Sequence, residues 1–126
     1  MNTLRVLLVC HISSEIGIGH LSRLLALAET LRKDNNVIPE FLIFGDFIKK
    51  DELANFNIHA FSLTDDFIDT IENILKISNF DTLIFDLYPE HNIDNLGKLF
   101  VQLKQRNIYL ISIDSLVEHC NILDLI

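Results

Sequence analysis

Near its N-terminus the chain reads LRVLLVCHISSEIGIGHLSR, residues 4–23. An apolar run of strand length, Leu4–Cys10, comes first, and the glycines Gly17 and Gly19 follow a short polar stretch. An amphipathic helical pattern starts directly after them. Glycines let a backbone approach a ligand without Cβ clashes. A helix start presents unpaired N–H groups and the positive end of the helix dipole. This combination favours a ligand that carries phosphate or sugar oxygens.

The rest of the chain alternates between strand-length apolar runs and helical stripes. Continuous apolar runs predict strands covered on both faces, and they lie at Leu4–Cys10, Val37–Phe44, Ile58–Leu63, Thr82–Phe85 and Ile108–Ile113. Apolar residues at helical spacing predict helices over 21–31, 67–75 and 96–103, with a shorter helix over Phe47–Phe56. The expected N-caps are Asp65 or Asp66 for the helix at 67 and Asn92 for the helix at 96. Residues 121–126 are a candidate sixth strand.

This βαβαβαβαβ order requires a parallel sheet with right-handed crossovers. We therefore expect one α/β domain over residues 1–126, a Rossmann-like three-layer fold with strand order 3-2-1-4-5. In such a sheet the ligand crevice lies between the first and fourth strands, beyond their carboxyl ends. The sequence shows no internal repeat, low-complexity segment or linker that would mark a second domain.

The composition of the chain limits the kinds of partner and compartment that we expect. A net charge of −8 argues against nucleic acid, because nothing in the sequence neutralises a run of phosphates. The apolar runs are far shorter than the ~20 residues that span a bilayer, so no membrane insertion is expected. Cys10 and Cys120 are the cysteines of the chain. Two isolated thiols in so apolar a chain are expected to be reduced and buried, which fits the cytoplasm.

Polar residues of three loops converge on the predicted crevice. They are Ser13, Ser14, Glu15, Gly17, Gly19 and His20 after the first strand, Asp86, Tyr88, Glu90 and His91 after the fourth, and Asp114, Ser115, Glu118 and His119 after the fifth. The helix start favours a neutral His20, the form that a general base needs. Simpler interpretations stay open: His20 caps its helix, Tyr88 is a packed aromatic residue, and Asp86 and Asp114 cap turns. Glu15 is a candidate partner for Arg23.

The sequence does not match the motifs of several familiar types of functional site. The histidines and cysteines lack the spacing of a zinc site, so no metal is expected. The serine elbow of a hydrolase triad and the lysine of a P-loop are missing. Residues 17–22 read G-x-G-x-x-S, one residue from the dinucleotide fingerprint. However, six residues, 11–16, separate the predicted strand from Gly17, whereas the dinucleotide fold needs its first glycine at the turn.

Four sequence blocks carry a family resemblance. They are Ser14-x-Ile16-Gly17-x-Gly19-His20-x-x-Arg23 with Leu25-x-Leu27-Ala28, then Leu83-Ile84-Phe85-Asp86-Leu87-Tyr88, Ile111-Ser112-Ile113-Asp114, and His119-Cys120-Asn121-Ile122-Leu123. In this order they resemble the N-terminal domain of the GT-B nucleotide-sugar enzymes. More narrowly, they are similar to the UDP-sugar hydrolases of pseudaminic acid biosynthesis and their spore-coat polysaccharide relatives.

The resemblance implies hydrolysis of a UDP-linked 2,4-diacetamido-2,4,6-trideoxy sugar at its anomeric C–O bond, with inversion and without a cofactor or metal. His20 would position or deprotonate the attacking water, and Tyr88 would contact the sugar. Together with the crevice residues, the expected substrate-binding set is Ser14, Gly17, Ile18, Gly19, Arg23, Asp86, Tyr88 and Asp114. GT-B enzymes bind the nucleotide mostly through a C-terminal domain. We expect this chain to be the N-terminal domain without that partner, inactive in isolation and able to form a homodimer through exposed apolar surface.

The chain departs from the family pattern at three positions. Val9 and His11 stand where the family carries Arg and Asp, and Leu87 stands in the middle of its Asp-His-Tyr segment. These departures leave a glycosyltransferase N-terminal domain and a non-catalytic Rossmann-like binding or assembly module as alternatives. A dinucleotide-dependent protein is a third.

Overall fold

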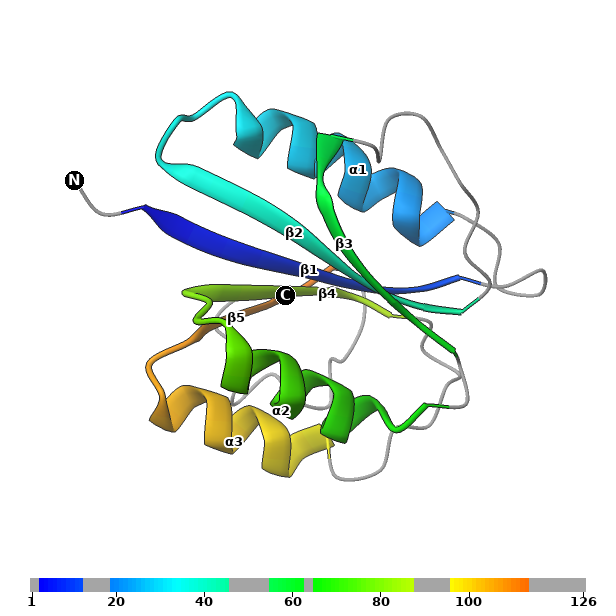
Figure 1. Ribbon diagram of the computed structural model, residues 1–126, viewed down its shortest axis with the longest axis vertical. Helices are drawn as coiled ribbons and strands as arrows, with labels where there is room; N and C mark the ends of the chain where they lie inside the picture. The colour runs from blue at the N-terminus through cyan, green and yellow to red at the C-terminus, as the bar shows by residue number, and fades with distance from the viewer. Residues whose placement is uncertain (1–2, 13–18, 46–54, 63–64, 88–95, 114–126) are drawn as a thin grey trace.

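The computed structural model describes residues 3–12, 19–45, 55–62, 65–87 and 96–113. Within them lie the strands β1 (Leu4–Ile12), β2 (Val37–Gly45), β3 (Asn57–Phe61), β4 (Thr82–Asp86) and β5 (Tyr109–Ser112) and the helices α1 (Gly19–Arg32), α2 (Phe67–Ile77) and α3 (Leu96–Gln105). Every strand pair is parallel, and the order is β3-β2-β1-β4-β5 (Figure 1). The predicted Rossmann-like α/β fold and its strand order are confirmed.

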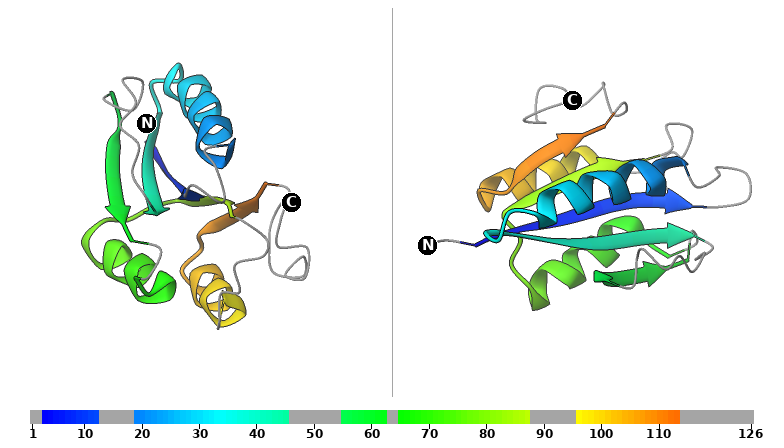
Figure 2. Two further views of the ribbon diagram at one scale, coloured as in Figure 1. Left: turned by 90° about the vertical axis from the view of Figure 1, so that its right-hand side faces the viewer. Right: turned by 90° about the horizontal axis from the view of Figure 1, so that it is seen from above.

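The sheet is the middle of three layers. α1 covers one face and α2 and α3 cover the other, while β3 and β5 form the two edges (Figure 2). Successive side chains of a strand point to opposite faces, so β1 contributes to two separate cores. Leu8 and Cys10 pack with Leu24 of α1, whereas Leu7 and Val9 belong to the core beneath α2 and α3. Burial on both faces explains why the strand sequences lack an apolar–polar alternation.

The central strand β1 extends two residues beyond its predicted end at Cys10 and stops at Ile12. The predicted apolar run ends before the polar His11. Its ring is instead buried, 5.9 Å from the ring centre of Phe67 and 6.1 Å from that of Phe44. The aromatic surface of the imidazole fills a core position, so the strand continues through it.

The N-cap of α2 is Asp66, one of the two predicted residues. Its side chain accepts a hydrogen bond of 2.9 Å from the backbone N–H of Asp69. β3 begins one residue earlier and ends two residues earlier than the predicted run Ile58–Leu63, and β5 is shorter than the predicted run by one residue at each end. No helix in the described part of the chain is long and apolar enough to cross a membrane.

Some predictions lie wholly or largely outside the described residues. They concern the cap at Asn92, the helix over Phe47–Phe56 apart from its last two residues, the thiol of Cys120 and the sixth strand over 121–126.

Candidate functional site

An ion pair joins the first helix to the carboxyl end of the fourth strand. Arg23 is the fifth residue of α1, and Asp86 is the last residue of β4. Nε of Arg23 donates to Oδ2 of Asp86 at 2.9 Å, and Nη2 donates to Oδ1 at 2.6 Å. The Asp86 side chain is 0% exposed, whereas 45% of the Arg23 side chain is exposed. The pair therefore anchors a surface guanidinium on a wholly buried carboxylate.

The strand register explains why these two residues meet. Cys10 of β1 is the partner of Asp86 in β4. Cys10 and Ile84 both pack in the core under α1, and alternation along β4 places Asp86 on the same face. α1 lies on this face through Leu21, Leu24, Leu25 and Ala28. Arg23 stands beside that apolar stripe, and a long flexible side chain from this position can reach the strand end.

The thiol of Cys10 lies in the same buried region. Burial, and secondarily the negative charge of Asp86, raises the pKa of Cys10 from 9.0 to about 12. The thiol therefore stays protonated throughout the neutral range, and only a thiolate is a good nucleophile or metal ligand. The sequence alone predicts a buried thiol at Cys10. Its proximity to Asp86 becomes visible once the parallel register of β1 and β4 is fixed.

His11 lies on the opposite face of the sheet from the ion pair. Its neighbours Phe44 and Phe67 belong to the core beneath α2, together with Val9. Val9 and His11 are thus both buried away from Arg23 and Asp86. These are two of the three positions at which the chain departs from the resembled family; the third, Leu87, is buried in the same core.

The predicted site residues fall into three groups. Arg23 and Asp86 are brought together directly. Gly19 and His20 form the start of α1, one helical turn before Arg23. The remaining members lie outside the described residues: Ser14, Gly17, Ile18, Tyr88 and Asp114. Glu15, the candidate partner of Arg23, also lies outside them.

The geometry limits what each partner of the ion pair can contact. Both carboxylate oxygens of Asp86 accept hydrogen bonds from Arg23, and the side chain is buried. Asp86 would therefore act on a ligand through Arg23. Among the described residues, no group of three or more His, Cys, Asp or Glu side chains could hold a metal ion.

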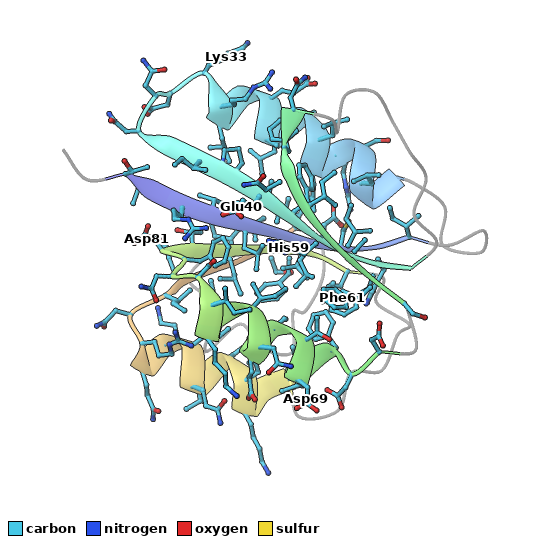
Figure 3. The ribbon with its side chains drawn as sticks, viewed as in Figure 1. Lys33, Glu40, His59, Phe61, Asp69 and Asp81 are labelled. Atoms are coloured by element: carbon cyan, nitrogen blue, oxygen red, sulfur yellow. The ribbon has the colours of Figure 1, made fainter. Side chains whose placement is uncertain are left out.

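A second buried carboxylate lies nearer the amino ends of the strands. Nη2 of Arg5 in β1 donates to Oε2 of Glu40 in β2 at 2.5 Å, and Nε2 of His59 in β3 lies 3.6 Å from Oε1 of Glu40. Figure 3 shows Glu40 and His59 side by side on neighbouring strands. The Arg5 guanidinium also lies 4.7 Å from the ring centre of Phe80, and the Arg5 backbone N–H donates to Oδ2 of Asp81 at 2.8 Å. This cluster cross-links three strands away from the predicted crevice.

Comparison with known proteins identifies the fold. No protein-family model and no curated protein matches the chain. Two solved structures of homoserine dehydrogenase from S. aureus, at pH 7.0 and pH 6.0, superpose with TM-scores of 0.54 and 0.52 at 12% and 13% identity. The alignments cover 98% of this chain and 30% of each dehydrogenase chain. At such identity the likeness shows a Rossmann-like fold and nothing of the activity.

Proposed function

We propose that the chain is the N-terminal, sugar-side domain of a UDP-sugar-processing enzyme that works in the cytoplasm. The proposed reaction is hydrolysis of a UDP-linked 2,4-diacetamido-2,4,6-trideoxy sugar. One observation supports it above the others. Arg23 ends the G-x-G-H-x-x-R block and Asp86 begins the Asp-x-Tyr segment, and these residues, 63 positions apart, pair directly. Two of the sequence blocks behind the resemblance thus meet at the carboxyl end of β4.

In the proposed reaction a water molecule attacks the anomeric carbon while the bond from that carbon to the UDP oxygen breaks. His20, in the first turn of α1, takes the proton of the water, and UDP leaves as the anion. Attack from the side opposite the leaving group inverts the anomeric centre. Tyr88 contacts the sugar. Gly17 and Gly19 let the substrate approach the backbone. The UDP itself is held mostly by a C-terminal domain.

A glycosyltransferase N-terminal domain is the second candidate. It would use the same crevice, with an acceptor hydroxyl in place of water. Val9 and His11 favour keeping this candidate, because these two buried residues stand where the resembled hydrolases carry Arg and Asp. In this candidate the sugar or the acceptor would differ from that of the resembled hydrolases. A non-catalytic binding module and a dinucleotide-dependent protein are the remaining alternatives.

The deciding experiment measures UDP release from a panel of UDP-sugars without acceptor, using the full-length protein. We expect release from a diacetamido-trideoxy sugar, lowered about 100-fold or more by His20→Ala because a general base is lost. His59→Ala is the matched control, since it removes a histidine of β3 that belongs to the Glu40 cluster. Turnover of His20→Ala within a few-fold of wild type would exclude His20 as the general base, and no release without acceptor from any UDP-sugar would contradict the hydrolase. Release that needs an added acceptor would instead identify the transferase.

A further inference from the structure

We propose that Arg23 and Asp86 form a positioning clamp: their ion pair fixes the first turn of α1, which carries His20, against the carboxyl end of β4. The effect of the clamp on catalysis rests on the proposed function, whereas its effect on the position of α1 does not. Arg23 and Asp86 are positioning residues in this scheme, and neither is assigned contact with the reacting atoms.

The apolar packing of α1 and its ion pair with β4 constrain the helix start in different ways. Its contacts with the sheet are aliphatic, made by Leu21, Leu24, Leu25 and Ala28 against strand residues such as Leu8 and Ile84. Hydrophobic attraction is non-directional and follows the buried area. The ion pair is directional, because two parallel N–H donors of one rigid plane meet two carboxylate oxygens. It therefore fixes the helix start both along the strand and around the helix axis.

Burial makes the clamp hard to open. Asp86 is wholly buried beside the Cys10 thiol, so an Arg23 that left it would remove two hydrogen bonds from a buried carboxylate. A ligand anion could recruit Arg23 from Asp86 only against that cost. The pair is thus better suited to hold its geometry while ligands bind and leave than to exchange partners with them.

The clamp acts close to the proposed catalytic residue. Arg23 follows His20 by three residues within one continuous helix. At about 1.5 Å of rise per residue, their backbones lie about 4.5 Å apart along the axis. A shift of the helix at Arg23 therefore moves the His20 backbone by nearly the same amount. Misplacement of a catalytic group by about 1 Å can lower a rate by as much as 100-fold.

The test compares two clamp variants with a matched control. Asp86→Asn removes the buried charge, and Arg23→Lys keeps the positive charge but loses the planar fork. Glu40→Gln is the control, because Glu40 is also buried and also bound to an arginine, but it lies away from the crevice. For each full-length protein we would measure hydrogen exchange of the amides at 21–24, the melting temperature, and kcat and KM for UDP release.

Both clamp variants are expected to accelerate exchange at 21–24 and to lower kcat about tenfold or more, with KM within about threefold of wild type. Glu40→Gln is expected to lower the melting temperature without either effect. If Asp86→Asn fails to fold, Arg23→Lys carries the test. Clamp variants that change exchange and kcat no more than Glu40→Gln would overturn the proposal, as would a rise in KM at constant kcat. If the wild-type protein releases no UDP, the proposed function fails, and local exchange at 21–24 still decides whether the clamp exists.

Discussion

Asp86 has a neighbour on each side: it binds Arg23 of α1 and lies beside Cys10 of β1. The Asp86 carboxylate is charged and fully desolvated, and Arg23 compensates it with two hydrogen bonds. The same carboxylate lies near the Cys10 thiol and, after burial, is the second cause of its raised pKa. A thiol in this position is a packing group and not a reagent.

The raised pKa of Cys10 predicts a loss of stability at alkaline pH. Folding raises this pKa from 9.0 to about 12, so the folded protein keeps a proton that the unfolded chain releases. The stabilisation is fully present below pH 9 and is lost as the pH rises from 9 towards 12. The loss reaches about 1.4 kcal/mol per pH unit, because the two states differ by one bound proton.

Urea unfolding at several pH values between 7 and 10.5 would measure this effect. Cys10→Ala is the reference variant, since it removes the thiol and leaves the other alkaline titrations in place. The free energy difference between wild type and Cys10→Ala should shrink as the pH rises above 9. Parallel pH profiles for the two proteins would show that the thiol does not titrate as described.

The sequence allowed Arg23 and Asp86 to be placed near the carboxyl ends of the strands, but it did not predict that they pair. Their placement followed from the strand order, since the carboxyl ends of parallel strands lie on one side of the sheet. The choice of partner depends on how far the Arg23 side chain reaches across the sheet, and this distance is set by the packing of α1. The ion pairs of Glu40 could not be predicted for a similar reason. It lies inside an otherwise apolar run, and its partners Arg5 and His59 come from two other strands.

Strands and helices were predictable where their hydrophobic patterns were long and regular. The stripes of α1, α2 and α3 and the runs of β1, β2 and β4 each correspond to an observed element. The boundaries were less predictable. β1 passes through His11 because Phe44 and Phe67 surround the imidazole, a contact between segments far apart in sequence. Such tertiary contacts decide where a strand ends, and a local pattern does not contain them.

The carboxyl ends of β1 and β2 approach each other closely at Gly45. This glycine pairs with Ile12 and has a φ of 131°, a conformation that side chains disfavour. A Cβ at this position would lie 1.6 Å from the carbonyl oxygen of Ile12. Because that oxygen belongs to a central strand, it can move only if the end of the sheet moves.

We expect Gly45→Ala to lower the free energy of unfolding by about 2 kcal/mol or more, through backbone strain and displacement of the β1 end. Asn57→Ala, at the exposed start of β3, is the comparison and should stay within about 0.5 kcal/mol of wild type. Chemical denaturation of the three proteins would measure both values. A Gly45→Ala protein as stable as wild type would mean that the two strand ends separate at little cost.

As a whole, the molecule has a fold that serves many chemistries. At 12% identity and a TM-score of 0.54, its likeness to homoserine dehydrogenase identifies an architecture and leaves the ligand open. The distinguishing features lie at the connection between β1 and α1. β1 ends at Ile12 and α1 begins at Gly19, so residues 13–18 join them. In the dinucleotide fold the first glycine stands at the turn directly after the strand, which places the pyrophosphate on the helix start.

This difference predicts that the full-length protein does not bind NADH, and the proposed function predicts that it binds UDP. Four residues, 13–16, stand in the sequence between the end of β1 at Ile12 and Gly17, and Ser22 takes the place of the third small residue of the fingerprint. NADH fluorescence should stay unchanged on addition of the protein at micromolar concentrations, whereas calorimetry should detect UDP. Asp86→Asn, if folded, should keep UDP binding, because the nucleotide is assigned mostly to a second domain and the clamp to the geometry of α1. Saturable NADH binding would instead place this chain functionally with the dehydrogenases whose fold it shares, and the crevice beside Arg23 would then be a pyrophosphate site.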